Sequence, residues 1–312
     1  MYENNAVSDY IGKKERMLHE ISDLLPASKI DITYETHAGT LAVSRRLLKS
    51  NFRLKKCFAT DLDLGTYSLL KQIQTGEPDE LIQKILNVGY DQNVFDWCKA
   101  IEAENYEEFS EEEIAVCKYI LLNQSYNAAC KSWRGLGSNR ENEARYKKNV
   151  KKFIEKGHFQ LQDIEIVHGD MMDYLGNFIN IQNAFIFIDS PYENSLRSSN
   201  LYSTDTDSEW HDRFLTRIRE YSKEKMLKAN LMICGYCNDQ NFKEDKYCKA
   251  LIPLGFKLYK LKDTIRPTVI RDTMIRKKNT VTEYCWLNYE PRSWIPRRNY
   301  YDYNDIFGDC TA

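Results

Sequence analysis

Short apolar runs rich in branched and aromatic residues recur along the 312-residue chain, and each is typical of a buried strand. Helical patterns separate several of these runs, and such alternation predicts a mainly parallel sheet with helices on both faces. The expected fold class is therefore α/β and Rossmann-like. The predicted strands are 30–34, 57–59, 164–167, 184–188 and 231–234, and the helical patterns between them include 41–48, 66–73 and 207–227.

The alternation breaks once, because no convincing strand pattern occurs between about residues 70 and 160. Helical patterns over 78–88, 93–104 and 111–122 lead there into a polar, basic segment, and such an inserted block predicts a second, mostly helical domain. We expect a poorly ordered or surface-draped tail after it, because the end of the chain is rich in Tyr, Asn and Asp. The predicted organisation is a discontinuous domain of residues 1–70 and 161–290, a helical domain of residues 71–160 and a C-terminal tail of residues 291–312.

The composition is that of an ordinary globular protein, with 42% hydrophobic and 29% charged residues. No apolar stretch is long enough for a membrane helix, and the amino terminus lacks the basic start and apolar core of a signal peptide. Nine cysteines without a repeating spacing indicate free thiols rather than a disulfide framework. We therefore expect a cytoplasmic protein without a membrane partner.

Two charge runs of opposite sign lie near each other in the expected helical block. Residues 102–113 carry seven glutamates and no base, and residues 131–152 carry eight bases and two acids. A charge run is more often an ordinary solvated surface, but opposite runs side by side favour one surface that binds a polyanion.

A carboxylate stands directly after the expected strand 184–188, where Asp189, Ser190, Pro191 and Tyr192 follow apolar residues. In an open parallel sheet, ligands bind beyond the carboxyl ends of the strands. A carboxylate and a backbone carbonyl could accept the two hydrogens of an adenine amino group there, and the aromatic ring could stack on the base. A common Asp-Ser-Pro turn explains these residues about equally well.

A second candidate site lies upstream, where a strand, a turn with Gly39, a helix and a strand ending in Asp61 follow one another. This layout is typical of binding to an adenosine-containing cofactor, with the acid on the ribose hydroxyl groups. Only one glycine is present where two or three are usual, so a plain turn explains the pattern about as well. Residues 10–14 are by themselves a helix start with a basic flank.

Together these motifs resemble the DNA adenine methylase (Dam) family, in the alpha group of amino-methyltransferases, over about residues 10–289. Their order and spacing carry the resemblance, since no single motif is decisive. The segments similar to family motifs are 10–14 (family Trp-Ala-Gly-Gly-Lys), 35–39 (Glu-Pro-Phe-x-Gly), 60–63 (Asn/Ala-Asp-Ile-Asn), 122–127 (Leu-Asn-Arg-x-x-Tyr/Phe-Asn-Gly), 145–148 (Arg-Tyr-Lys-Lys), 168–170 (an acidic loop), 189–192 (Asp-Pro-Pro-Tyr) and 282–289 (a closing strand).

The resemblance implies a class I methyltransferase that transfers a methyl group from S-adenosylmethionine to the exocyclic amine of an adenine flipped out of duplex DNA, without a metal. Positioning and electrostatics would then supply most of the catalysis. The residues implied at the cofactor are Tyr10, Lys14, Glu35, Gly39, Asp61, Asp170 and Asp189, and those implied in catalysis are Asp189, Ser190, Pro191 and Tyr192.

The helical block falls where the resembled family has its target-recognition domain, and its basic run is typical of a surface that follows DNA phosphates. Trp133 and Tyr146 lie in this run as rings that could wedge or stack. A solvated helix with ordinary ion pairs over 141–152 is the alternative. The residues expected to contact DNA are Asn123, Tyr126, Asn127, Arg134, Arg140, Arg145, Tyr146, Lys147 and Lys148.

Two positions depart from the family pattern. Leu41 stands where a second glycine is usual, and Ser190 replaces the first proline of the catalytic tetrapeptide. The alternatives to an active DNA methyltransferase are a catalytically degenerate DNA- or cofactor-binding protein of the same fold and an RNA adenine methyltransferase. Cys234 and Cys237 have metal-like spacing, but buried free thiols are the favoured interpretation because no second pair is near in sequence.

The expected partner is double-stranded DNA, and the resemblance favours a monomer or a weak dimer. It is also compatible with a cognate restriction endonuclease, as in a restriction-modification pair.

Overall fold

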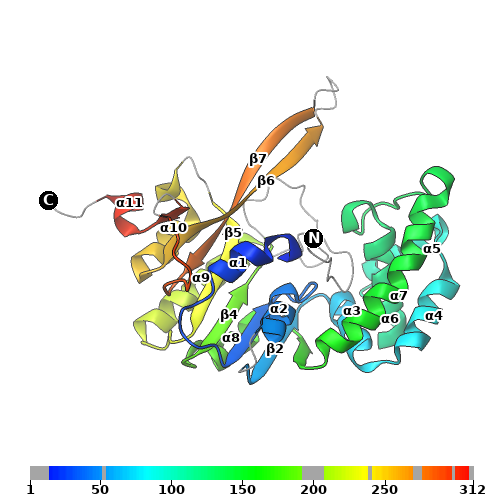
Figure 1. Ribbon diagram of the computed structural model, residues 1–312, viewed down its shortest axis with the longest axis horizontal. Coiled ribbons are helices and arrows are strands. Elements are labelled where there is room, and N and C mark those ends of the chain that lie inside the picture. The colour runs from blue at the N-terminus through cyan, green and yellow to red at the C-terminus, as the bar shows by residue number, and fades with distance from the viewer. Residues whose placement is uncertain are drawn as a thin grey trace. The chain divides into compact units, whose positions relative to one another are not determined.

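The computed structural model describes residues 14–50, 54–191, 207–237, 241–269, 276–296 and 299–308. The chain forms two compact units, which are described separately (Figure 1). The first unit comprises residues 1–16, 37–173 and 201–204, and the second comprises residues 17–36, 174–200 and 205–312.

The first unit combines two parallel strands with a block of helices. Strands β2 (Lys56–Asp61) and β3 (Ile164–His168) pair in parallel, with Asp61 opposite His168. The chain between these strands contains no strand of its own. Its helices are α3 (Leu64–Thr75), α4 (Pro78–Val88), α5 (Gln92–Ala103), α6 (Glu111–Gln124) and α7 (Glu141–Leu161), with short 3-10 turns at Tyr126–Ala128 and Ser138–Arg140, while α2 (Ala42–Ser50) precedes β2.

Local signals set the ends of these helices. Ser110 and Glu113 form a reciprocal capping box at the start of α6, and Gly89 ends α4 with a φ of 93°. Helix α6 is buried from Ile114 to Gln124 and packs against α3, α4 and α5. It is therefore the central helix of this unit, which explains why its sequence lacks a polar face.

The second unit contains the other strands, in the order β1, β4, β5, β7, β6 and β8. The pairs β1–β4 and β4–β5 are parallel, whereas β5–β7, β7–β6 and β6–β8 are antiparallel. Figure 1 shows β6 and β7 as a long two-stranded ribbon that extends beyond the rest of this sheet. The bounds are β1 (Ile32–Thr36), β4 (Ala184–Ile188), β5 (Asn230–Tyr236), β6 (Lys257–Val269), β7 (Arg276–Leu287), β8 (Tyr300–Tyr301), α1 (Leu18–Asp23), α9 (Ser208–Lys223), α10 (Lys246–Leu251) and α11 (Tyr303–Phe307); α8 (Met171–Ile179) begins in the first unit.

All five strands predicted from the apolar runs are present, and every pairing among them within a unit is parallel. Helices accompany them, so the predicted Rossmann-like α/β fold class is confirmed. The tail is more regular than its composition suggested, because β8 pairs with β6 and Asp302 caps α11. Among the described residues, no helix combines the length and apolar composition needed to cross a membrane.

Candidate functional site

A tight turn in the first unit is hydrogen-bonded to the end of β2. The Gly39 amide donates to Asp61 Oδ2 at 3.0 Å, and the Ala38 amide donates to the Thr60 carbonyl at 2.9 Å. His37, Gly39 and Leu41 all have a φ between 52° and 54°. This turn therefore depends on three left-handed residues, of which glycine alone adopts that conformation without strain.

Asp61 ends β2 with a buried carboxylate that accepts two backbone amides, from Gly39 and, at 2.9 Å, from Asp63. Burial raises the pKa of the Asp61 carboxyl to about 7, and the negative charge of Asp63 adds to the rise. The two amides and Lys118 act in the opposite direction. At neutral pH this carboxyl is poised between its two protonation states, so a ligand that donates hydrogen bonds to it favours the charged form.

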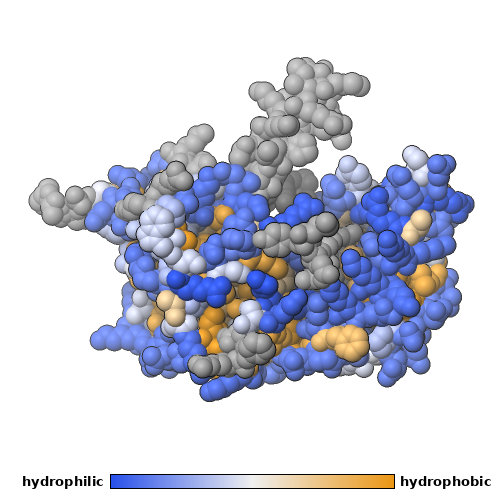
Figure 2. Space-filling view, in the orientation of Figure 1, coloured by the Kyte–Doolittle hydropathy of each residue, from blue (hydrophilic) through white to orange (hydrophobic). Residues whose placement is uncertain are grey.

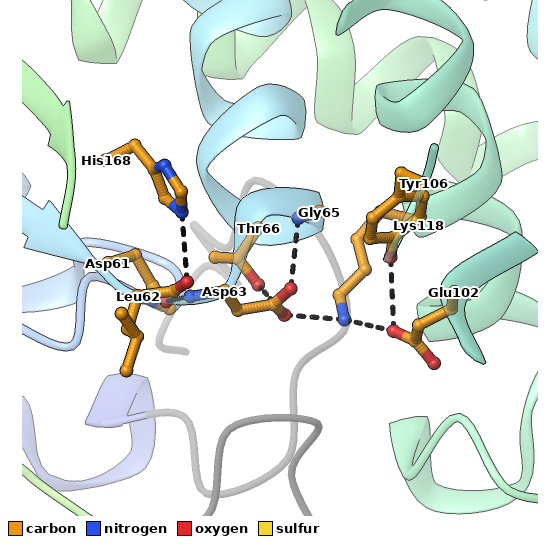
Figure 3. Close-up of polar contacts among 10 residues, drawn as sticks. Asp61, Leu62, Asp63, Gly65, Thr66, Glu102, Tyr106, Lys118 and His168 are labelled. Atoms are coloured by element: carbon orange, nitrogen blue, oxygen red, sulfur yellow. Dashed lines mark hydrogen bonds and ion pairs between the residues drawn. The ribbon is translucent and has the colours of Figure 1, made fainter. Parts of the chain in front are cut away.

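Lys118 of α6 links Asp63 to the helical block through a buried ion network (Figure 3). Its Nζ lies 2.6 Å from Asp63 Oδ2 and 2.7 Å from Glu102 Oε1. Asp63 also caps α3, because its Oδ1 accepts the Gly65 amide at 3.0 Å. The ion pair holds the pKa of Asp63 below its usual range and that of Lys118 well above. No sequence signal distinguished this lysine from its neighbours.

Arg45 of α2 fixes the following part of the glycine turn. Its Nε donates to the Thr40 carbonyl at 2.9 Å, and its guanidinium lies 2.7 Å from Glu15 Oε1. Thr40 Oγ1 also donates to Glu15, at 2.8 Å. Buried Arg45 is thus a positioning residue that the sequence did not reveal, and Lys14, next to Glu15, is itself buried.

Leu41, which replaces the family's second glycine, has a positive φ of 54° and a fully buried side chain. The backbone therefore keeps the conformation that a glycine would favour, while the side chain joins the hydrophobic core of the first unit. The substitution costs backbone strain and gains buried apolar area.

The second unit places acids at the carboxyl ends of two neighbouring parallel strands. Glu35 of β1 is buried and lies opposite Phe187 of β4. Asp189 follows β4 directly and is partly buried, and Ser190 after it is buried. Pro191 is partly buried. Of the other predicted residues, Tyr10 and Tyr192 lie outside the described residues.

Asp170 has a structural role in the first unit. Its Oδ1 accepts the Met172 amide at 2.9 Å and so caps the start of α8. The loop before it is fixed to β2, because the Gly169 amide donates to the Asp61 carbonyl at 3.0 Å. A cofactor contact of Asp170 stays a prediction.

Several expected DNA contacts are accessible on the helical block. Tyr126 is 64% exposed, and Asn127, Arg145 and Lys148 are exposed as well. Arg140 and Lys147 are also exposed, but both pair with Glu143 at 2.9 Å. Arg134 is partly buried and donates to the Ser125 carbonyl at 3.0 Å. These residues therefore include both exposed side chains and side chains held by local pairs.

Tyr146 and Asn123 lie in the interior, which corrects their assignment to a DNA contact surface. The Tyr146 ring packs against Tyr90 and Tyr119, at centroid distances of 5.3 and 6.0 Å. The Asn123 side chain is buried and donates to the Tyr119 carbonyl at 2.9 Å. The partly buried Trp133 ring also packs on Tyr90. The helical spacing of the buried α7 residues Tyr146, Val150, Phe153, Ile154, Gly157 and Leu161 is a signal that could have revealed this.

In the first unit, a glycine turn is hydrogen-bonded to a buried acid at the end of β2, which is typical of a Rossmann-like enzyme that binds a nucleotide-containing cofactor. The model of the D12 class N6 adenine-specific DNA methyltransferase family matches residues 10–264. The chain therefore belongs to this family, and it is an enzyme that methylates adenine in DNA with a methyl donor.

Comparison with other proteins adds little to this assignment. No curated protein sequence matches the chain. Similar solved structures include precorrin-6y C5,15-methyltransferase from Geobacter metallireducens GS-15, with 10% identity, 92% of this chain and 97% of that chain covered, and a TM-score of 0.37. Another is the rRNA methyltransferase aviRa from Streptomyces viridochromogenes, with 12% identity, 87% and 80% covered, and a TM-score of 0.31. Both TM-scores are too low for these structures to inform the function of this chain.

Proposed function

We propose that this enzyme transfers the methyl group of S-adenosylmethionine to N6 of an adenine that is flipped out of duplex DNA. The observation that supports the proposal most strongly is the position of Asp61 and Asp189, each at the carboxyl end of a parallel strand. A methyl transfer of this kind needs one acid for the ribose of the donor and one acceptor for the target amine.

The first unit offers groups suited to the donor. Asp61 accepts two amides, but a carboxylate has about four acceptor positions, so two remain for the ribose hydroxyl groups. Gly39 allows the backbone to approach the methionine part of the donor, because no Cβ obstructs it. Lys14 would bind the donor's carboxylate, and Tyr10 and Asp170 would complete its surroundings in this unit. Glu35, in the second unit, is a separate candidate for contact with the donor. When bound, S-adenosylmethionine supplies an electrophilic methyl group on a sulfonium.

The chain's own residues would activate the amine at the end of β4. An adenine amine is a weak nucleophile because its lone pair is delocalised into the ring. Asp189 would accept one hydrogen and the Ser190 carbonyl the other, which would free the lone pair for in-line attack. Pro191 would stiffen this loop, and Tyr192 would stack on the flipped base. Only the carbonyl of residue 190 takes part, so serine fits in place of proline.

One face of α7 is suited to DNA phosphates. Lys148, Lys151, Lys152 and Lys156 follow helical spacing and line a shallow depression together with Glu155 and the exposed Phe159. Figure 2 shows a mainly hydrophilic surface over the helices of this block. Such lysines would bind the DNA backbone without reading sequence. We assign residues 71–160 to target recognition on this basis, and Tyr126, Asn127, Arg134, Arg140, Arg145 and Lys147 stay candidates for further contacts.

We propose a cytoplasmic enzyme that acts on DNA as a monomer or weak dimer, and a cognate restriction endonuclease is compatible with this activity.

A transfer assay separates the proposal from its alternatives. The purified enzyme is incubated with methyl-labelled S-adenosylmethionine and either unmethylated duplex DNA or RNA of matched sequence. We expect label in DNA alone. Label in RNA would favour an RNA adenine methyltransferase, and no label with measurable donor binding would favour a degenerate binder.

Calorimetry tests the donor site separately. Because binding hydroxyl groups favours charged Asp61, and its pKa is about 7, we expect the affinity for S-adenosylmethionine to fall by up to about tenfold per pH unit below 7. Asp61→Asn should weaken binding and remove this dependence. A pH-independent affinity in the unaltered enzyme would contradict the role of Asp61.

A further inference from the structure

Three metal-ligating side chains meet in the second unit, beyond the carboxyl end of β5. Cys237 directly follows β5, Asp245 precedes α10 and Cys248 lies in its first turn. One ligand atom from each residue lies within 4.8 Å of the others, and the two sulfur atoms are 3.4 Å apart. The proposed methyl transfer uses none of these groups.

We propose that Cys237, Asp245 and Cys248 bind one zinc ion, with water as the fourth ligand. Zinc binds thiolates at about 2.3 Å in tetrahedral geometry, which places two ligating sulfurs roughly 3.8 Å apart. The sulfurs here need to separate by only a few tenths of an ångström. Two thiolates and one carboxylate are a donor set that selects zinc over magnesium or calcium, which prefer oxygen ligands.

Local hydrogen bonds hold two of the ligands in place. Asp245 caps α10, where its Oδ1 accepts the Cys248 amide at 3.0 Å, and both residues are buried. Tyr247, between them, packs on Trp286 at a centroid distance of 5.1 Å and shares a 2.6 Å hydrogen bond with His211. The hydrogen bond between Asp245 and Cys248 orients these two ligands before the ion arrives, and the Tyr247 contacts hold α10, which carries Cys248, in place.

Cys237, the third protein ligand, leaves the site accessible to an ion and supplies the second thiolate. Cys237 is only partly buried, so an ion can reach the site from its side. Binding would replace the S–H···S contact with two zinc–sulfur bonds and release two thiol protons. The dication would then face two thiolates and one carboxylate, for a net charge of −1. Zinc would tie α10 to the end of β5.

The metal-like spacing in the sequence involves a different pair, Cys234 and Cys237, for which free thiols were the favoured interpretation. Cys234 lies within β5 and is opposite Cys285 of β7, whereas the partner of Cys237 is Cys248, eleven residues away. The Cys-x-x-Cys motif therefore does not form the cluster. Only the packing of α10 brings Cys248 to the end of the strand.

Metal titration of the reduced, metal-free full chain tests the proposal. Cobalt serves as a spectroscopic probe, because thiolate ligation gives a near-ultraviolet charge-transfer band and tetrahedral geometry gives strong visible bands. We expect saturation at one equivalent, displacement by zinc, and a higher unfolding midpoint with zinc. Cys237→Ser should lower zinc affinity by about 100-fold or more, and Asp245→Asn by about 10- to 100-fold. Cys285→Ala, a buried cysteine outside the cluster, should retain the bands.

Two results would overturn the proposal: no stoichiometric cobalt or zinc binding by the reduced protein, or unchanged bands in Cys237→Ser. Cys237 is partly exposed, so its serine variant is expected to fold, which circular dichroism verifies. The protein could instead be about two mass units lighter after purification without reductant and bind no zinc once it is reduced. That result would assign Cys237 and Cys248 to a disulfide. The readouts do not depend on methylation, so they hold whatever DNA the enzyme modifies.

Discussion

The variant Asp61→Asn distinguishes two contributions of this carboxyl to the free energy of unfolding. One is the pH-dependent cost of burying its charge, and the other is the pH-independent contribution of its hydrogen bonds. The pKa of Asp61 rises from 3.8 to about 7 in the folded protein. Between pH 3.8 and pH 7, Asp61 is protonated in the folded protein but ionised in the unfolded chain. The free energy of unfolding therefore decreases as the pH rises through this range, and this contribution is lost above about pH 7. Asparagine carries no such charge.

The size of the effect on stability follows from the difference between the folded and unfolded pKa of Asp61. About three pKa units at ~1.4 kcal/mol each give about 4 kcal/mol between pH 3.8 and 7, of which about 3 kcal/mol falls between pH 5 and pH 7. Asparagine leaves either the Gly39 or the Asp63 amide without an acceptor, at a pH-independent cost of about 1–3 kcal/mol. The free energy of unfolding of the variant, relative to the unaltered enzyme, should therefore rise by about 3 kcal/mol from pH 5 to pH 8.

Urea denaturation at several pH values measures this difference. Asp79→Asn, on the exposed side of α4, removes the same charge without burial and is the matched control, for which we expect little change with pH. A difference between Asp61→Asn and the unaltered enzyme that stays constant from pH 5 to pH 8 would show that Asp61 does not retain a proton in the folded protein.

Three further changes probe the first unit. Lys118→Met leaves the buried Asp63 and the partly buried Glu102 without their cation and should cost about 3–5 kcal/mol in denaturation at pH 7, whereas unchanged stability would show that the Asp63–Lys118 pair is not buried. Leu41→Gly relieves about 1–2 kcal/mol of backbone strain but loses a fully buried side chain worth about 2–5 kcal/mol, so thermal unfolding should show a net loss, and a more stable variant would contradict it. The double variant Lys148→Gln/Lys152→Gln should weaken DNA binding about equally for all sequences and reduce the slope of log K against log salt concentration by about 1.8. Lys84 pairs with Glu112, so the control Lys84→Gln should change neither the affinity nor the slope. An unchanged slope in the double variant would remove α7 from the DNA interface.

The sequence predicted the parallel strands well because each is a short buried run with clear flanks. The run 184–188 is an example, since all five residues of β4 are buried and no polar position obscures the pattern. Strand β6 was not predicted, because its alternating lysines and apolar residues do not form such a run. Its position depends on pairing with β7, which is a tertiary effect.

The position of Asp61 at the end of a strand was predictable, because it directly follows a short apolar run. Contacts were not predictable where the partner comes from a distant helix. Lys118 and Cys248 look ordinary in sequence, and only helix packing brings them to Asp63 and Cys237. Tyr146 shows the reverse, because its place in a basic motif suggested a surface role while its helical spacing placed it in the core.

The most direct test of the account is nucleoside mass spectrometry of unmethylated duplex DNA after incubation with S-adenosylmethionine and the enzyme. We expect N6-methyldeoxyadenosine with the unaltered chain, and a loss of about 10²-fold or more with Asp189→Ala, which should still bind DNA. Methylated adenine at an undiminished rate in Asp189→Ala, or no methylated adenine with the folded, unaltered enzyme on several DNAs, would contradict the account.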